Sequence, residues 1–226
     1  MGWSSLSVTT RMGSIFPKSF DKTVRGAAAA FAALVAGAVG MLAYLAYPTQ
    51  VKTGYQPVQP VAYSHKLHAG NLGMDCRYCH FTVERANFAA VPPTETCMNC
   101  HQRVKSQSPL LTVVRESYAS GQPILWVRVH KLADYVYFSH RAHVGAGVSC
   151  VSCHGRVDQM VEVRQVQPLT MAWCLDCHRN PASRVRPAEF VTKLDWQPDR
   201  DPAEIGREII AAKHITPPVN CSGCHR

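Results

Sequence analysis

One long apolar run lies near the start of the chain, and the rest of the chain has no run of similar length. The 22 residues at 26–47 carry no charge, and most of them are apolar. As an α-helix they would span about 33 Å, enough to cross the core of a bilayer. The pattern predicts a transmembrane helix at 26–47, an N-terminal segment at 1–25 and a Pro- and Gly-containing linker at 48–60.

The charges around this run predict its orientation. Four basic residues (Arg11, Lys18, Lys22 and Arg25) precede it, and the first basic residue after it is Lys52. By the positive-inside rule, the N-terminus is cytoplasmic and the remainder periplasmic, in a bacterial cytoplasmic membrane. The alternative is a cleaved signal peptide, but the run is longer than a typical signal core and ends without a good cleavage site. We therefore expect a retained single-pass anchor.

The anchor is rich in small residues, since ten Ala and three Gly make up more than half of it. Small residues allow helices to approach closely in a membrane. The composition predicts that the anchor packs against other transmembrane helices.

After the linker, only one segment has a complete helix signature. In DPAEIGREIIAAKH, Asp201 is suited to the N-cap, Pro202 to the first helical position and Glu204 to the third. The sequence therefore predicts a helix that begins after Asp201. It would bring His214 near the end of the chain.

All ten cysteines occur in five CxxC pairs, and a histidine follows each pair directly. Zinc ribbons use two CxxC pairs for each metal, so five pairs would leave one unused, and disulfides need no adjacent histidine. CxxCH is the attachment signature of c-type haem. The cysteines predicted to form thioether links to haem are Cys76, Cys79, Cys97, Cys100, Cys150, Cys153, Cys174, Cys177, Cys221 and Cys224.

The motif predicts five covalently bound haem c groups. Each adjacent histidine would be the proximal ligand of one iron, namely His80, His101, His154, His178 and His225. Five haems leave too few residues at 61–226 for an ordinary apolar core. We therefore expect one haem-cored periplasmic cytochrome domain at 61–226, mostly α with many loops and little regular structure, with short helices carrying each CxxCH.

Six histidines remain as candidate distal ligands: His65, His68, His130, His140, His143 and His214. Four of them belong to an internal repeat, at about 61–101 and 136–178, in which aromatic-Ser-His-x-x-His precedes one CxxCH and a second CxxCH follows. The two words are YSHKLHAGNLGMDCRYCH and FSHRAHVGAGVSCVSCH. At a spacing of three on a helical turn, two imidazoles can serve two irons. We expect the first histidine of each pair to ligate a haem of its own repeat and the second to reach a different haem.

The fifth haem, on His225, would draw on His130 or His214, or share a ligand by crossing over, and one histidine is left over. Met171 and Met98 are reserve ligands, although packing is the commoner role for methionine. An iron with two histidines has no open position for a substrate, so the pattern favours electron transfer, and no residue is predicted to be catalytic.

The net charge of +9 does not indicate a nucleic-acid partner. Basic residues are not interleaved with aromatic ones, and haem propionates would offset much of the excess.

Several flanking words extend these motifs, namely YSHKLH, DCRYCH, VPPTETCMNCH, WVRVHKLADYVYFSHRAH, MAWCLDCH and a terminal CSGCH. The aromatic-Ser-His-x-x-His arrangement resembles the class III, bis-histidine multihaem cytochromes. Over 25–226 the set is similar to the membrane-anchored pentahaem cytochrome c subunit of alternative complex III.

This resemblance implies a subunit of a quinol:electron acceptor oxidoreductase. Its implied partners are an iron–sulfur/molybdopterin-like subunit, polytopic quinol-binding membrane subunits and a monohaem cytochrome c. Electrons would pass from the iron–sulfur subunit toward the monohaem cytochrome or a soluble acceptor.

Two other functions fit part of the pattern. A stand-alone membrane-anchored quinol dehydrogenase that feeds a periplasmic reductase would share the single anchor. A multihaem reductase would need an open haem, which the surplus of histidines disfavours.

Overall fold

The computed structural model describes residues 17–47 and 52–225. The chain divides into two units, Met1–Gln50 and Val51–Arg226. Most of the predicted segment at 1–25 and the start of the predicted linker lie outside the described residues.

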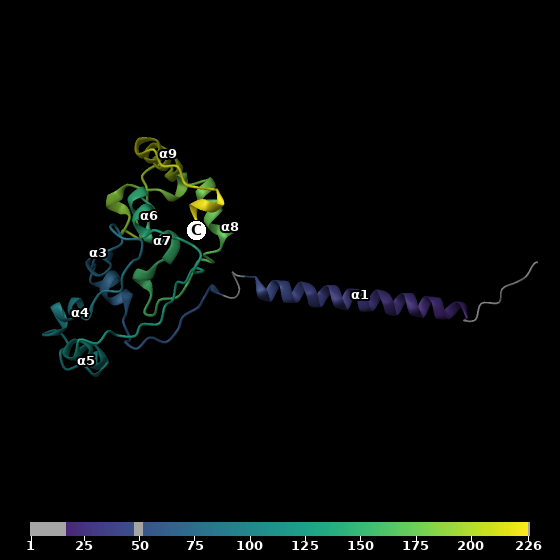
Figure 1. The fold of residues 1–226 in the computed structure, drawn as a ribbon, viewed down its shortest axis with the longest axis horizontal. Coiled ribbons are helices and arrows are strands. Elements are labelled where there is room, and N and C mark those ends of the chain that lie inside the picture. Colours follow the sequence, from purple (N-terminus) through teal and green to yellow (C-terminus); the bar gives the residue numbers. More distant parts are fainter. Residues whose placement is uncertain (1–16, 48–51, 226) are drawn as a thin grey trace, which may run out of the picture. The chain divides into compact units, whose positions relative to one another are not determined.

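Helix α1, Lys18–Ala46, forms the described part of the first unit (Figure 1). It begins at Lys18, before the expected start at residue 26, because the apolar pattern marks only the part suited to lipid. Helical hydrogen bonding continues through the preceding polar residues, up to Pro17 in an extended conformation. Over Ser19–Ala46 the most apolar window has a mean hydropathy of 2.0. By length and composition this helix could cross a membrane, a test that a signal sequence in the same place also passes. It favours single-pass anchoring.

The second unit is built from short helices and loops. The described residues contain no β-strand, only two isolated bridges, Val136 with His225 and Val148 with Val185. The α-helices are α3 (Cys76–Cys79), α4 (Thr94–His101), α5 (Thr112–Ser120), α6 (His140–Ala146), α7 (Cys150–His154), α8 (Met171–Arg179) and α9 (Pro202–Lys213). A π-helix, η1, covers Lys66–Asn71, and the 3₁₀-helices are η2 (Pro109–Leu111), η3 (Val157–Gln159), η4 (Ala182–Arg184), η5 (Ala188–Phe190) and η6 (Cys221–Gly223). The expectation of a mostly helical, loop-rich fold is confirmed.

Each CxxCH segment lies on one of these short elements, and in three of the five a polar side chain in front of the segment caps the first turn. The carboxylate of Asp75 accepts from the Arg77 N–H at the start of α3. Thr170 and Asn220 cap α8 and η6 in the same way. The predicted helix after Asp201 is α9, in which the Asp201 side chain accepts from the Ala203 N–H at 3.0 Å.

Little of this unit is an apolar core. Eight of the described hydrophobic residues are buried: Val61, Met98, Val114, Met160, Val185, Val191, Leu194 and Ile205. The cluster of Val61, Met98 and Val114 packs against Trp126 and a few other partly buried side chains. A domain of this length normally buries many more apolar residues.

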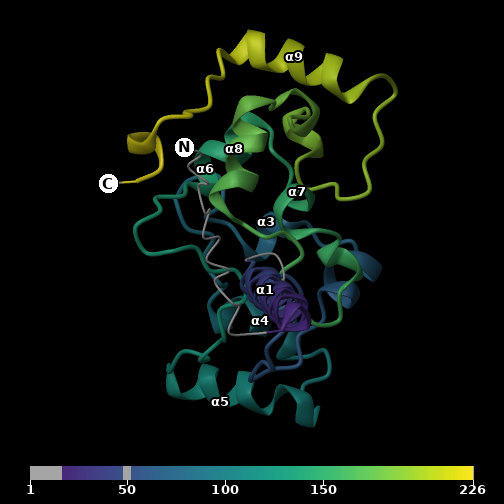
Figure 2. The ribbon, with the colours of Figure 1, turned by 90° about the vertical axis from the view of Figure 1, so that its right-hand side faces the viewer.

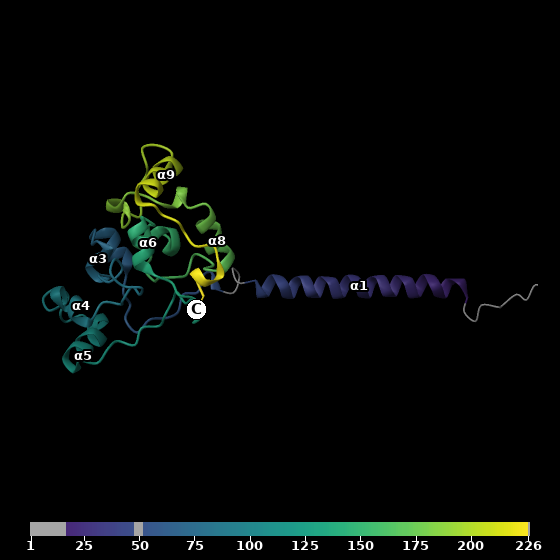
Figure 3. The ribbon, with the colours of Figure 1, turned by 45° about the horizontal axis from the view of Figure 1, so that its top comes forward.

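Within the second unit, the helices follow one another from one side to the other. Helices α4 and α5 lie at one side, α3, α6 and α7 occupy the middle, and α8 and the C-terminal segment lie beyond them (Figures 1 and 3). In the view turned by 90°, α5 and α9 are at opposite extremes with α3 and α7 between them (Figure 2). The five CxxCH segments are therefore spread across the unit.

Candidate haem-binding sites

The two histidines of the second repeat pack against the aromatic residue that precedes them. Phe138 stacks on His143, with ring centroids 4.4 Å apart and 27° between the planes. It meets His140 edge-on at 4.8 Å. Because Ser139 caps α6 by accepting from the Ala142 N–H, both histidines project from one turn of helix.

The first repeat reproduces this arrangement. Tyr63 stacks on His68 at 4.5 Å and 22°, and it meets His65 edge-on at 4.8 Å. Here the turn is η1, a π-helix that begins directly after His65. The aromatic ring holds the first imidazole perpendicular and the second parallel to itself in both repeats. Sequence reasoning offered Phe138 as a possible contact of a haem face but did not place either ring against the histidines, although the aromatic residue is repeated in both motifs.

Seven histidines share one hydrogen-bonding pattern. In each, Nδ1 lies 2.7–3.3 Å from a backbone carbonyl oxygen. A ring whose Nδ1–H donates to a carbonyl presents Nε2 as its free base, which is the state that a metal binds. The seven are His68, His80, His101, His140, His143, His178 and His225.

Three proximal histidines face a distal one at a similar separation. The ring centroids are 6.0–6.4 Å apart. An iron between two imidazoles requires about 6 Å, from two metal–nitrogen bonds of about 2 Å each and about 1 Å within each ring. The pairs are His68 with His101, His140 with His154, and His143 with His178. Within the described residues no group of three His, Cys, Asp or Glu side chains is placed to bind a metal ion directly.

His65 is buried close to His80. Burial lowers the pKa of His65 to about 4, and the neighbouring His80 and His68 lower it further. Its Nδ1 is buried without a hydrogen-bond partner. His65 is therefore neutral at pH 7, as a metal ligand must be.

His154 is the centre of the largest group of imidazoles. Burial lowers its pKa to about 3, with smaller contributions from His130, His140, His80 and His65. The His130 ring lies 4.4 Å from that of His154, edge to face, which is too close for an iron between them. The Nε2 of His130 is buried without a hydrogen-bond partner.

The last CxxCH is placed differently. His225 Nδ1 lies 3.3 Å from the Tyr135 carbonyl oxygen, and the two rings are 5.6 Å apart. His214 occupies the end of α9 in the left-handed region, with φ 51°. Among the ring contacts of the described residues, none joins His225 to His130 or His214.

All ten cysteines have free thiols, so none is committed to a disulfide. The thiols of Cys76 and Cys150 hydrogen-bond with each other, and this contact together with burial raises the pKa of Cys150. Burial raises the pKa of Cys153 to about 11. The thiols are thus available for thioether links.

The two reserve ligands lie in contrasting places. Met98 is 8% exposed, inside the cluster with Val61 and Val114. Met171 is 66% exposed at the start of α8. Met98 therefore packs in the apolar core, and the structure places neither sulfur in an imidazole pair.

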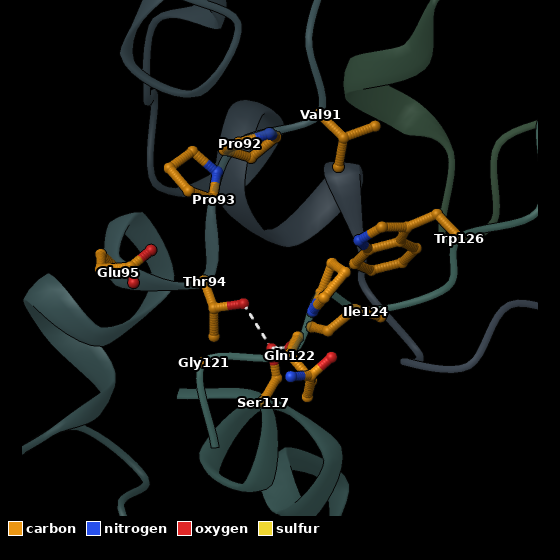
Figure 4. Close-up of a pocket in the computed structure, with 11 residues that line it drawn as sticks. Val91, Pro92, Pro93, Thr94, Glu95, Ser117, Gly121, Gln122, Ile124 and Trp126 are labelled. Carbon is orange, nitrogen blue, oxygen red and sulfur yellow. Dashed lines mark hydrogen bonds between the residues drawn. The ribbon is translucent and has the colours of Figure 1, made fainter. Parts of the chain in front are cut away.

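A cavity of about 270 Å³ lies at the start of α4 (Figure 4). Thr94 and Ser117 hydrogen-bond through their hydroxyls at 2.7 Å, and Pro93 and Trp126 form part of the walls. The residues that line it include no histidine or cysteine. It is separate from the imidazole pairs.

Two family models match parts of this chain. Residues 136–226 match the model described as cytochrome c7 and related cytochrome c, and residues 43–117 match the class III cytochrome C family. Each match contains one of the two repeated words. The chain thus contains class III-type multihaem cytochrome c regions.

A curated relative points the same way. The chain is 36% identical over 130 residues to the menaquinone reductase, multiheme cytochrome c subunit, of Nitratidesulfovibrio vulgaris (strain Hildenborough). The match covers 57% of this chain and 59% of the length of that relative. Both comparisons are thus with multihaem c-type cytochromes.

Proposed function

We propose that this chain binds five haem c groups and relays electrons within a membrane quinol:electron acceptor oxidoreductase of the alternative complex III type. The observation that carries the proposal is the geometry of the histidines. Three pairs have the separation that an iron requires, and seven rings have Nδ1 at 2.7–3.3 Å from a backbone carbonyl oxygen, which leaves Nε2 for the iron. When bound, haem supplies reversible one-electron chemistry.

The residues divide into anchors and ligands. Each CxxC pair would form two thioether links, and the histidine after it would bind the iron from one side. On the other side we assign His65 opposite His80, His68 opposite His101, His140 opposite His154 and His143 opposite His178. The distal ligand opposite His225 would be His214 or His130. The other of these two histidines would bind no iron and would lie near the haems.

The surroundings of the ligands suit transfer of electrons. Burial keeps His65 and His154 neutral, so protons do not compete with iron for these rings at pH 7. Aromatic stacking and carbonyl contacts fix the ring planes. Rigid, saturated ligation limits rearrangement when the charge of the iron changes.

The proposed site of action is the bacterial cytoplasmic membrane. Helix α1 would anchor the chain with its N-terminus in the cytoplasm and the haem domain in the periplasm. Its small residues would pack against polytopic quinol-binding subunits. The other proposed partners are an iron–sulfur/molybdopterin-like subunit, which donates electrons, and a monohaem cytochrome c or soluble acceptor.

The curated relative favours a second candidate function, in which electrons pass in the opposite direction, from the haems to a quinone. Its name describes a menaquinone reductase, so this chain would then deliver electrons to a quinone. Reduction of the haems by added menaquinol in intact membranes would support the first direction. Oxidation of pre-reduced haems by menaquinone, with no reduction by menaquinol, would support the second. A stand-alone quinol dehydrogenase would show the menaquinol reaction in purified chain without partners.

The primary test is low-temperature EPR of the oxidised protein, together with a pyridine haemochrome count. We expect five haems for each chain, all low-spin, because every iron would carry two histidines. Fewer than five haems, or a full equivalent of high-spin iron, would overturn the proposal. The Cys221→Ser/Cys224→Ser variant is the matched control, since it should lose one haem and keep the other low-spin signals.

A further inference from the structure

We infer that the five CxxCH segments form one unbranched row, whose order in space is 97–101, 76–80, 150–154, 174–178 and 221–225. The haems that they carry would follow the same order. This inference rests on the proposed function and adds the path through the domain. The second motif in the sequence would be an end of the row, and the first would be next to it.

The first junction joins α4 to α3. The side-chain amide of Asn99, inside CMNCH, donates to the Tyr78 hydroxyl, inside CRYCH, at 3.1 Å. These two motifs are therefore neighbours.

The second junction joins α3 to α7 through a segment far away in the sequence. The Thr192 hydroxyl donates to the Asp75 carboxylate at 2.8 Å, directly before Cys76. The neighbouring carbonyl of Val191 accepts from the Ser149 hydroxyl at 2.7 Å and from the Cys150 N–H at 3.3 Å. One dipeptide thus holds the starts of both helices side by side.

A second contact fixes the same junction. The backbone N–H and the Nδ1 of His140 both lie 3.0 Å from the Asn87 carbonyl oxygen, in the loop that follows His80. His140 is the histidine that faces His154. The loop of the first repeat therefore positions the ring that faces the third motif.

The third junction is a single turn of α6. His140 faces His154 at 6.4 Å, and His143 faces His178 at 6.0 Å. Because these two distal histidines are three residues apart, the motifs at 150–154 and 174–178 lie on either side of the same turn.

The fourth junction joins α8 to the C-terminal segment. His178 Nδ1 lies 2.7 Å from the Pro218 carbonyl oxygen, just before Cys221. The last motif therefore adjoins the fourth.

No shortcut crosses the row in the described part of the chain. None of the hydrogen bonds or ring contacts there joins 97–101 to the last three motifs, or 221–225 to the first two. Figures 1 and 3 show the same sequence, from α4 through α3 and α7 to α8 and the C-terminal segment. Partners would exchange electrons at the two ends, beside His101 and beside His225.

Iron positions test the order directly. We would locate the irons of the haem-loaded, detergent-solubilised full chain by anomalous diffraction at the iron edge. The inference expects the iron on His80 to have those on His101 and His154 as its two nearest neighbours. The inference would be overturned if the iron on His101 were nearer to the iron on His154 or His225 than to the iron on His80. A haemochrome count below five haems for each chain would instead contradict the proposed function.

A variant tests the central junction without a crystal. Thr192→Val removes the hydroxyl that donates to Asp75, and we expect the Soret circular-dichroism couplet of the closest haem pair to be lost while the haem count stays at five. Thr94→Val, which removes a hydroxyl near the end of the row, is the matched control and should keep the couplet. An unchanged couplet in Thr192→Val with loss in Thr94→Val would overturn the arrangement.

Discussion

The two repeats reach the same geometry from sequences of different length. Seven residues separate the second histidine from the CxxC in the first repeat, and six do so in the second. The first repeat forms a π-helix over Lys66–Asn71, where the second forms an α-helix that ends before Gly147. A π-turn accommodates one extra residue without moving what precedes it. The one extra residue of the first repeat is thus accommodated between its second histidine and its CxxC pair.

The hydrogen bonds after the insertion show how it is absorbed. The Met74 N–H donates to the His68 carbonyl at 3.0 Å, and the Val148 N–H donates to the His143 carbonyl at 2.9 Å. Gly73 and Gly147 precede these donors, and both have positive φ, 66° and 94°. The histidine pair and the start of CxxC are therefore fixed in both repeats, while the chain between them varies.

The largest effect is expected when the second histidine of each repeat is replaced. We expect His143→Ala and His68→Ala each to convert about one haem to the high-spin form, because each would remove one sixth ligand. Low-temperature EPR of the oxidised variants measures this. Arg141→Ala, in the same turn of α6, is the control and should leave all haems low-spin. If only one of the two variants produced high-spin iron, the repeats would not be equivalent.

A smaller effect distinguishes the two glycines. An alanine at either position would take a left-handed conformation, which costs about 1–2 kcal/mol. At Gly147 the added Cβ would also collide with the Arg186 carbonyl oxygen, whereas nothing lies within 4 Å at Gly73. Thermal unfolding of the haem-loaded variants should show the larger loss of stability for Gly147→Ala. Equal losses would show that this contact is relieved without cost.

The aromatic rings should contribute less. Phe138→Leu and Tyr63→Leu remove the stacking on His143 and His68, which is worth about 0.5–1.5 kcal/mol. We expect a modest fall in unfolding temperature and broader low-spin EPR signals, because the rings lose their fixed planes. Tyr63→Phe keeps the stacking and is the control. A fall as large in Tyr63→Phe would assign the effect to the hydroxyl.

The smallest expected effect is a difference in the pH dependence of stability between the residues that precede α3 and α7, Asp75 and Ser149. Burial raises the pKa of Asp75, but the Arg77 N–H and Thr192 hydroxyl outweigh it, and the net pKa lies below the usual value. The Asp75 carboxylate therefore stabilises the folded protein at pH values above its unfolded pKa of about 4. This contribution to stability is lost as the pH falls through the lower pKa of the folded state. Ser149, at the equivalent position before α7, donates its hydroxyl to the Val191 carbonyl and does not titrate.

Asp75→Asn should therefore flatten the acid side of the stability profile. The difference from wild type should be well under about 1 kcal/mol, because Asp75 is half-exposed and screened by solvent. Unfolding temperatures of both proteins from pH 6 to pH 3 measure it. Ser149→Ala should lower stability by the same amount at every pH. Parallel profiles for Asp75→Asn and wild type would contradict the assignment.

Local features of this fold could be predicted from the sequence. The helix after Asp201 follows from its capping residue, short helices were expected at each CxxCH, and the repeat was visible as two similar sequence motifs. Helix α1 begins at Lys18, before the membrane span predicted at 26–47, since hydropathy marks the apolar part and not the whole hydrogen-bonded helix.

Contacts between distant segments were not predictable. The bond from Thr192 to Asp75 depends on tertiary packing, and Thr192 belongs to no motif. The position of His130 beside His154 was also missed, because the spacing around an isolated histidine does not indicate which residue it will contact.

The bond between Asp75 and Thr192 has a consequence for biogenesis. Its two residues are 117 positions apart, and the segment with Thr192 comes after four of the five CxxCH motifs. If the haem domain is exported as proposed, its residues cross the membrane in order after the anchor, and the surroundings of the first motif cannot be completed until most of the domain has crossed. Attachment of cofactor to the early cysteines would therefore act on a chain that has not yet closed, and closure of the central junction would follow as one of the last steps of maturation.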